Sequence, residues 1–373
     1  MTKKSRRIIF FICIILFLLI APYIVMYSLG YRVDVANKKI VTTGGIYVKA
    51  LPQGANVIID SKINKKTGIL SNAVFVQNLL PKQHTVVIKK EGFHDYQKTL
   101  EVKEREVTKL EHIILFKNNI VFQILEDKTQ SPFNKKTLED AYIIKNNTLY
   151  YSDIEENNQL SPTQKNTPII KNIIAFKVLD KNIVWLSLDG FLYNFNMERK
   201  NTEKLSVRDI FIHQKNIYTL LIFNQTIFLK ENDTLFIFDE KIKSFENFYG
   251  SVKNMQISPD RQKILYCNDH EILFSFLNSN NPEKIFLNRF SKKINECHWI
   301  NNEYVIFSLE NSIIISEIDK RGNINAISLK ETISLQGNAD INIQSPEILF
   351  NKEDGKLYIL TQNTILVSEK LIP

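Results

Sequence analysis

The chain has 373 residues, enough for two or three domains with a sizeable core. Hydrophobic residues make up 44% and charged residues 24%, and only 11 Gly and 10 Pro occur, which excludes collagen-like, linker-like and broadly disordered chains. Lys and Arg number 48 against 40 Asp and Glu, but Lys3, Lys4, Arg6 and Arg7 supply four of them and the others are scattered among acidic residues. A groove that follows nucleic-acid phosphates is therefore not expected, and no nucleic-acid partner is predicted.

The chain begins with a membrane-length apolar segment. Every residue from 8 to 29 is apolar or aromatic except Pro22 and Ser28, and a helix of this length extends about 33 Å, enough to cross a bilayer. The cations before it predict that residues 1–7 form a cytoplasmic tail and that everything after Gly30 is extracytoplasmic. The sequence therefore predicts a single-pass protein of the cell membrane whose first partner is the lipid bilayer, through residues 8–29.

A cleaved signal peptide is the alternative to an anchor, because Ser28-Leu29-Gly30 has the small residues of a cleavage site. The apolar stretch exceeds the 7–15 residues usual for a signal core, which favours an uncleaved anchor. Cys13 lacks the small residues that precede a lipid-attachment cysteine and is interpreted as an apolar residue of the membrane segment. Residues 30–44 are expected to form a juxtamembrane segment.

Short alternating segments predict a small β-sandwich over residues 45–116. In the last of them Leu100 and Val102 alternate with polar residues, which is the period-two pattern of a half-buried sheet. Turn residues separate the segments. The expected strands are 45–50, 55–60, 73–76, 84–89 and 96–102.

These turns carry a resemblance to the PEGA domain. The turn that gives the family its name reads Pro52-Gln53-Gly54-Ala55 here, a Leu-Pro-x-x-His turn lies at 80–84, and Glu-Gly-Phe follows at 91–93. Gln53 replaces the family's Glu, Lys82 a frequent Gly, and Thr67-Gly68 a usual Thr-Pro. These departures alter turns rather than the fold. The resemblance implies an envelope-facing, non-catalytic module that mediates adhesion or assembly.

Residues 117–373 repeat a two-strand pattern that predicts a β-propeller of about six blades. Each copy is an apolar strand, a short turn rich in Asn, Asp, Gly or Glu, and a second apolar strand, as a β-hairpin requires. The mean spacing of about 43 residues fits the period of a four-stranded blade. The first apolar residues after the six turns are Leu149, Phe191, Leu235, Ile272, Ile313 and Ile365.

Residues 257–266 resemble the Ser-Pro-Asp-Gly-Lys signature of WD-repeat-like and TolB-like propellers. Ser258 and Asp260 are expected to cap a tight turn between the innermost and the second strand of a blade, and Arg261 stands where the signature has Gly. With the N-terminal apolar segment and the PEGA-like module, the whole chain resembles bacterial membrane-anchored PEGA-domain proteins that carry a C-terminal propeller.

No linear motif for catalysis or for cofactor or metal binding occurs. No two of the six His lie within five residues of each other, and neither a nucleophile elbow, a Walker loop nor a dinucleotide fingerprint is present. His84 lies beside a turn in a strand-rich domain and is interpreted as a structural residue rather than a metal ligand. No catalytic, cofactor-binding or metal-binding residue and no cofactor are therefore predicted, and the binding residues stay unassigned.

Two pairs of residues leave alternatives open. Cys267 and Cys297 fall in strands of adjacent expected blades, where a disulfide is one option, but buried free thiols are favoured because the sequence gives no distance between them. Trp185 and Trp299 are either sugar-stacking platforms or blade core, and core packing is favoured because aromatic residues are enriched in strands.

These features favour a non-enzymatic, envelope-anchored binding or scaffolding protein, whose PEGA-like module and propeller engage an extracytoplasmic protein or polysaccharide. The alternative is a propeller-type hydrolase or lyase that acts on envelope polymers with groups from several blades. A convergent cluster of carboxylates on one propeller face would favour the enzyme. A signalling role is disfavoured, because only seven residues precede the membrane segment.

Overall fold

The computed structural model describes residues 3–34, 38–125, 132–134, 138–151, 168–277, 282–329, 332–334, 340–361 and 364–372. These residues form two compact units. The first consists of Met1–Ile120, Ser316–Ile327 and Glu369–Pro373, and the second of Val121–Ile315 and Ser328–Ser368. The turn of the last expected hairpin, Gln362-Asn363, lies outside the described residues.

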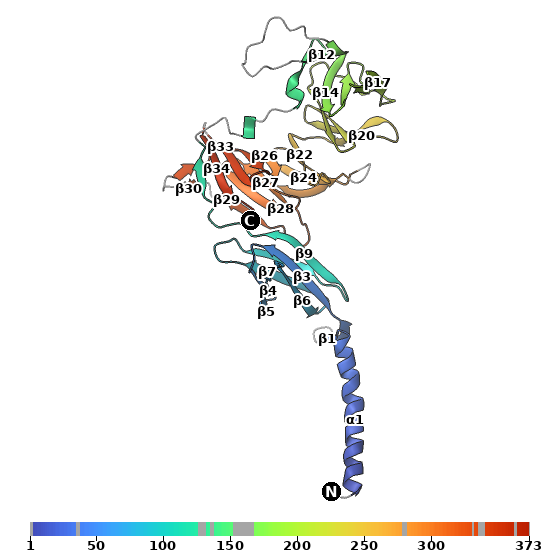
Figure 1. Ribbon diagram of the computed structural model, residues 1–373, viewed down its shortest axis with the longest axis vertical. Helices are drawn as coiled ribbons and strands as arrows, with labels where there is room; N and C mark the ends of the chain where they lie inside the picture. Colours follow the sequence, from blue (N-terminus) through green and yellow to red (C-terminus); the bar gives the residue numbers. More distant parts are fainter. Residues whose placement is uncertain are drawn as a thin grey trace. The chain divides into compact units, whose positions relative to one another are not determined.

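The first unit begins with helix α1 (Lys3–Ser28), the long helix of Figure 1. Its span Ser5–Ser28 has a mean hydropathy of 3.2, and none of its most apolar part is buried against protein. A helix satisfies its own backbone hydrogen bonds, which is the requirement for a segment surrounded by lipid. By length and composition α1 is able to cross a membrane, and it begins before the predicted boundary at residue 8.

A β-sandwich follows in the first unit and confirms the predicted all-β module. Its sheets have the strand orders β5-β4-β7-β8 and β6-β3-β9, and a separate hairpin, β1-β2, precedes them. Ile46, Val57 and Val86 are fully buried between the sheets. The strand bounds are β1 (Tyr31–Asp34), β2 (Lys39–Thr42), β3 (Gly44–Leu51), β4 (Asn56–Ile59), β5 (Ile63–Lys66), β6 (Ala73–Leu79), β7 (Gln83–Lys89), β8 (Tyr96–Glu101) and β9 (Val107–Ile114).

The remaining strands form a β-propeller, with five four-stranded sheets and one three-stranded sheet among the described residues, and a separate two-stranded sheet, β30-β31. The bounds are β10 (Phe122–Ile124), η2 (Pro132–Asn134), η3 (Leu138–Ala141), β11 (Tyr142–Lys145), β12 (Thr148–Tyr151), β13 (Pro168–Lys171), β14 (Ile173–Leu179), β15 (Asn182–Ser187), β16 (Leu192–Asn196), β17 (Asn201–Lys204), β18 (Tyr218–Phe223), β19 (Thr226–Glu231), β20 (Thr234–Asp239), β21 (Ser244–Tyr249), β22 (Asn254–Ile257), β23 (Lys263–Cys267), β24 (Glu271–Phe276), β25 (Ile285–Arg289), β26 (Ile294–Trp299), β27 (Tyr304–Leu309), β28 (Ser312–Glu317), β29 (Ala326–Leu329), β30 (Thr332–Ser334), β31 (Asp340–Asn342), β32 (Glu347–Asn351), β33 (Lys356–Thr361) and β34 (Thr364–Lys370).

These six sheets confirm the predicted number of blades. In each four-stranded sheet, such as β14-β15-β16-β17, neighbouring strands run antiparallel, and the predicted hairpins join two strands of one sheet. Apolar side chains of successive sheets pack together, as Leu186 and Leu220 do. Stacking of this kind covers sheet faces that would otherwise meet solvent.

The last blade combines the two ends of the second unit. Its order is β10-β34-β33-β32, and Phe122 of β10 lies opposite Ser368 of β34. The first propeller strand in the sequence is therefore the outermost strand of the sheet that the last strands form. This arrangement ties residues 122–124 to residues 366–368 by strand pairing.

Candidate functional site

Both tryptophans belong to the propeller core, as expected. Trp185 is buried on β15 and stacks on Tyr193, with 5.1 Å between ring centroids. Trp299 is buried on β26, where its backbone N–H and its indole N–H both donate to Gln256. Neither indole face is open to a ligand, so the interpretation as sugar-stacking platforms is wrong.

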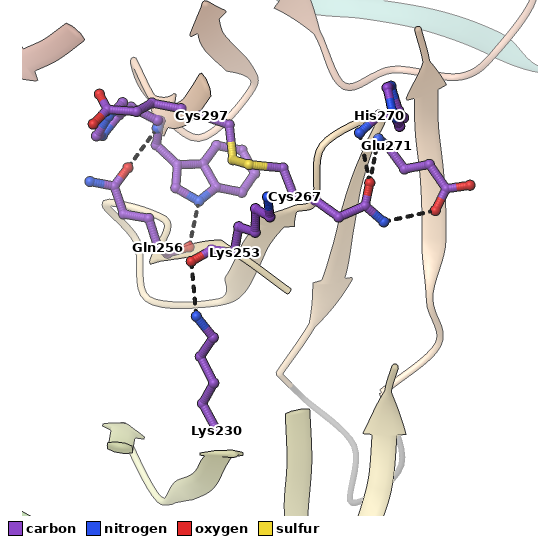
Figure 2. Close-up of a disulfide and its surroundings, with 11 residues drawn as sticks. Lys230, Lys253, Gln256, Cys267, His270, Glu271 and Cys297 are labelled. Atoms are coloured by element: carbon purple, nitrogen blue, oxygen red, sulfur yellow. Dashed lines mark hydrogen bonds and ion pairs between the residues drawn. A yellow bond between two sulfur atoms is a disulfide. The ribbon is translucent and has the colours of Figure 1, made fainter. Parts of the chain in front are cut away.

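Cys267 and Cys297 form a disulfide (Figure 2), and the expectation of free thiols is wrong. The two residues lie on β23 and β26, strands of neighbouring blades that contact each other, with their Cα atoms 6.6 Å apart. The sequence indicates which strands carry the cysteines. It does not indicate that both side chains point into the same interface between blades, and this placement decides the pairing.

One carboxylate–histidine pair on β26 is the candidate catalytic group for the hydrolase or lyase alternative. His298 Nε2 lies 3.3 Å from Glu296 Oε2, and the same oxygen accepts a hydrogen bond from the Ile348 N–H. Burial opposes ionisation of Glu296, but these two bonds prevail and hold its pKa below the ordinary value. A carboxylate held ionised in this way is a poor general acid. Among the described residues, no three His, Cys, Asp or Glu side chains form a group suited to a metal.

The strongest candidate for a binding surface is the connection between β17 and β18, residues 205–217. Its side chains alternate between partly buried and exposed positions. Ile210 and Ile212 pack against the propeller core, whereas Phe211 between them points to solvent. Val207 is 69% exposed, and Phe211 and Ile217 are each 74% exposed. A connecting loop is usually polar, so large exposed apolar side chains on it indicate a contact surface.

Hydrogen bonds to partly buried and exposed polar groups hold this connection in place. The Tyr218 hydroxyl accepts a hydrogen bond from the His213 N–H and donates to Glu231 Oε1 at 2.6 Å. Burial and the bond to Glu231 raise the pKa of Tyr218 to about 12, so the hydroxyl keeps its proton and remains a donor. The Ile217 N–H donates to Asn232 Oδ1, and the Ile210 N–H donates to the Gly190 carbonyl. The exposed side chains of 205–217 are therefore presented by a fixed backbone.

His84, the histidine of the first unit considered as a ligand, is structural, as expected. It is buried on β7, with Nδ1 2.6 Å from Asp60 Oδ2 and Nε2 2.8 Å from the Leu80 carbonyl oxygen. Burial opposes ionisation of Asp60, but hydrogen bonds from the Thr85 N–H and His84 hold its pKa below the ordinary value. Both ring nitrogens are occupied by neighbouring turns, so neither is free to bind a metal.

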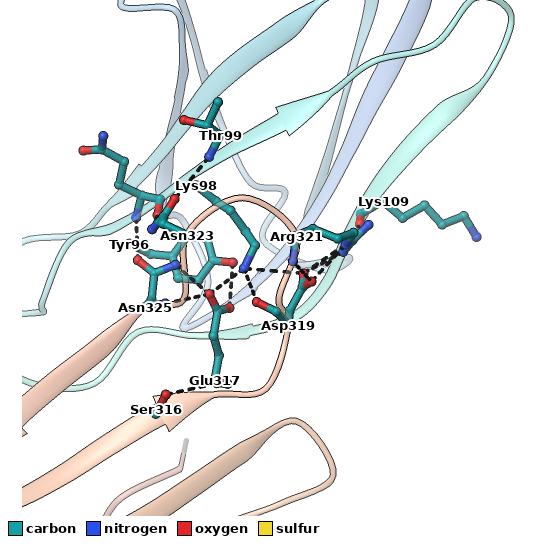
Figure 3. Close-up of polar contacts among 11 residues, drawn as sticks. Tyr96, Lys98, Thr99, Lys109, Ser316, Glu317, Asp319, Arg321, Asn323 and Asn325 are labelled. Atoms are coloured by element: carbon teal, nitrogen blue, oxygen red, sulfur yellow. Dashed lines mark hydrogen bonds and ion pairs between the residues drawn. The ribbon is translucent and has the colours of Figure 1, made fainter. Parts of the chain in front are cut away.

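A second polar network surrounds the buried side chain of Lys98 (Figure 3), which is 0% exposed on the edge strand β8. Its Nζ lies 2.6 Å from Glu317 Oε1, and the Glu317 side chain is 3% exposed. Glu317 also accepts hydrogen bonds from the Tyr96 hydroxyl and from both the backbone and the side-chain N–H of Asn325. Such a pair is tolerated in an interior only when its remaining hydrogen-bonding capacity is satisfied.

The residues around Glu317 seal one edge of the sandwich. The Asn323 and Asn325 side chains bond to backbone groups of Gln97, and Asn323 also accepts the Thr99 N–H, so they occupy the outer edge of β8. Arg321 donates to the Lys109 carbonyl on β9, the edge strand of the other sheet. The segment 316–327 therefore closes the gap between β8 and β9 with side-chain hydrogen bonds in place of a further strand.

The sandwich that carries these contacts matches a known family in sequence. Residues 43–114 match the PEGA domain. The match ends before residues 316–327, so the segment that seals the β8–β9 edge of the PEGA domain is an addition from elsewhere in the chain. No curated protein sequence matches the chain.

Several solved structures resemble the chain at low similarity. The extracellular domain of a hybrid two component system from B. thetaiotaomicron has a TM-score of 0.40 and 11% identity, with 77% of this chain and 36% of that chain covered. Hsv2 of Kluyveromyces lactis has a TM-score of 0.37 and 11% identity over 57% and 64% of the two chains. BamB of Moraxella catarrhalis has a TM-score of 0.33 and 9% identity over 78% and 82%. The propeller assignment rests on the sheet orders instead.

Proposed function

We propose that this protein is a membrane-anchored, extracytoplasmic binding or scaffolding protein, which uses residues 205–217 of its propeller to hold a partner protein. The PEGA domain and the propeller supply rigid β-structure, and function on such folds resides in exposed loops. The observation that carries the proposal is the set of exposed apolar side chains at Val207, Phe211 and Ile217 on a connection with a fixed backbone.

The expected location has α1 as an uncleaved single-pass anchor, with residues 1–7 in the cytoplasm. The basic residues nearest to the apolar segment lie before it and at its far boundary, where the Arg32 guanidinium lies 3.5 Å above the Tyr27 ring. Aromatic and basic side chains of this kind are typical of the membrane interface. Protease added to spheroplasts is expected to digest the propeller and to leave α1 in the membrane fraction. An intact propeller under these conditions would contradict the orientation.

A protein is favoured over a polysaccharide as the partner because two of the three exposed side chains are aliphatic. Sugar rings stack on aromatic faces, of which this surface offers only Phe211, whereas Val207 and Ile217 gain free energy chiefly by leaving water. An apolar centre of this kind is typical of a protein–protein contact.

Site-specific crosslinking tests the surface. A photoreactive residue at position 211 or 217 is expected to give a discrete crosslinked product in cells, and the same residue at Phe286, an exposed position on β25, is expected to give none. The double variant Phe211→Ser/Ile217→Ser should lose the product obtained from position 207 while retaining wild-type tryptophan fluorescence. The same product from position 286, or none from 207, 211 or 217, would refute the proposed surface.

The alternative expected from the sequence, a hydrolase or lyase, needs several acidic or basic groups that converge. The described residues offer the Glu296–His298 pair, in which the Glu296 oxygen is already shared with the Ile348 N–H. Binding is therefore the function that these residues support best.

A further inference from the structure

The sandwich of the PEGA domain has two edges, one covered by another segment of the chain and one open. The β8–β9 edge is sealed by residues 316–327, as described above. The opposite edge consists of β5 and β6, and β6 is the terminal strand of its sheet in the order β6-β3-β9. Between β5 and β6 themselves, Lys65 Nζ donates a long hydrogen bond of 3.5 Å to the Phe75 carbonyl.

Apolar side chains line this open edge. The turn before β6 is held by hydrogen bonds from the Gly68 N–H to Ala73 and from the Asn72 N–H to Gly68, which place Ile69 and Leu70 at its tip. Ile69 is 75% exposed and Leu70 is 99% exposed. Turn tips normally carry Gly, Asn, Asp, Ser or Pro. Phe75 on β6 is exposed as well. The edge therefore combines a terminal strand of its sheet with exposed apolar side chains.

The charged residues of the sequence segment that contains this edge are all basic. Residues 61–90, which include β5, β6 and β7, contain six Lys and no Asp or Glu. Residues 31–120 as a whole hold 15 Lys and Arg against 8 Asp and Glu, so this region has a net surplus of basic residues. Lys65 and Lys66 lie on β5, the other strand of this edge, where like charges would disfavour the approach of a second copy of the same edge.

The position of the turn argues against lipid as its occupant. Asn78, near the other end of β6, accepts a hydrogen bond from Arg32, which follows α1 closely in sequence. A seven-residue strand extends about 20 Å. Ile69 and Leu70 therefore lie at the end of β6 that faces away from the helix.

We propose that β6 is a strand-addition site for an extended acidic segment of a partner protein. In this mode the incoming backbone pairs with β6, its alternate apolar side chains cover Phe75, Ile69 and Leu70, and its carboxylates meet Lys65 and Lys66. The site lies on the PEGA domain, apart from residues 205–217, so either surface can fail its test while the other stands.

Peptide titration of the full-length protein, purified in detergent, tests this site. The probe is a fluorescent peptide of alternating Val and Glu, and binding is measured by anisotropy at low salt together with hydrogen exchange of β6. The peptide should bind and slow exchange in β6, and Lys65→Glu/Lys66→Glu should weaken binding about tenfold or more. Ile69→Ser/Leu70→Ser should weaken it about fivefold.

Two controls separate strand addition from diffuse attraction. Lys103→Glu/Lys109→Glu makes the same change in net charge with exposed lysines near the sealed edge, and should leave binding within about twofold of wild type. A fully N-methylated peptide keeps the charge but lacks N–H donors, and should not bind. The proposal is overturned if the unmethylated peptide fails to protect β6, if the methylated peptide binds equally, or if both lysine pairs weaken binding to the same extent.

Discussion

The buried Lys98–Glu317 pair predicts an asymmetric response to substitution. Glu317→Ala removes a carboxylate that accepts hydrogen bonds from Lys98, Tyr96 and Asn325, and leaves the Lys98 ammonium buried. The acceptors that remain for Lys98 are the Asp319 carbonyl at 2.8 Å and the Asp319 carboxylate at 3.6 Å. Breaking a buried pair in this way lowers the free energy of unfolding by about 3–5 kcal/mol.

Lys98→Met should cost less than Glu317→Ala. Methionine keeps most of the volume of the side chain, and Glu317 retains its bonds from Tyr96 and Asn325. The loss is the charge-assisted hydrogen bond to Glu317, about 1.5–3 kcal/mol, together with the bond to the Asp319 carbonyl. The double variant removes the stranded charge as well. It should therefore be more stable than Glu317→Ala alone, by about 1–2 kcal/mol.

Hydrogen exchange of β7 and β8 measures these free energies, because both tryptophans lie in the second unit and their fluorescence reports on the propeller alone. Lys89→Met is the matched control, since Lys89 pairs with Asp95 at the surface and should contribute at most about 1 kcal/mol. A double variant less stable than Glu317→Ala, or a Glu317→Ala variant as stable as the control, would refute the reasoning.

Three further predictions concern other contacts. The Cys267–Cys297 disulfide closes a loop of 30 residues, and reducing it should lower the free energy of propeller unfolding by about 3–4 kcal/mol. Urea titration followed by tryptophan fluorescence measures this change. An unchanged unfolding midpoint after reduction would contradict the disulfide. Burial opposes ionisation of Asp319, but the hydrogen bonds from Arg321 prevail and keep the pKa of Asp319 below 3.8. The contribution of ionised Asp319 to stability is therefore complete above pH 3.8 and is lost as the pH falls through the lowered pKa. Asp319→Asn should reduce the difference in PEGA-domain stability between pH 7 and pH 3, and an equal difference in both proteins would count against this explanation. Gly322→Ala should open the β8 edge, because φ at Gly322 is +65° and an added Cβ would lie 2.2 Å from the Thr99 carbonyl oxygen. Gly54→Ala is the control for the backbone angle alone, because φ at Gly54 is +71° and the space around it is open. Hydrogen exchange at the Thr99 N–H is expected to become faster in the Gly322 variant and to stay unchanged in the Gly54 variant.

Local patterns predicted most of the secondary structure. Strands with one buried face alternate in polarity, and the hairpin spacing indicated six blades because each blade repeats the same strand–turn–strand unit. The Ser258–Asp260 turn also forms as expected between β22 and β23, and Arg261 has φ +58°, which explains why the signature has Gly there. Strands β5 and β9 were missed because their exposed positions are mostly Lys, Asn, Thr and Glu.

The long-range contacts were not predictable from such patterns. Nothing near Lys98 in the sequence indicates that Glu317 meets it, because the partner is more than two hundred residues away. The Cys267–Cys297 pairing likewise depends on how two blades stack. For residues 205–217, the alternation of Ile210 and Ile212 with Phe211 was a usable signal, since it marks a chain segment with one anchored and one exposed face.

The strand order of the last blade has a consequence for biosynthesis. Because β10 needs β34 as its neighbour, the propeller cannot complete its hydrogen bonding until the ribosome has reached residues 364–370. The sandwich, although it emerges first, waits for residues 316–327 to neutralise Lys98. Each unit therefore completes its contacts only after residues near the C-terminal end of the sequence have been synthesised.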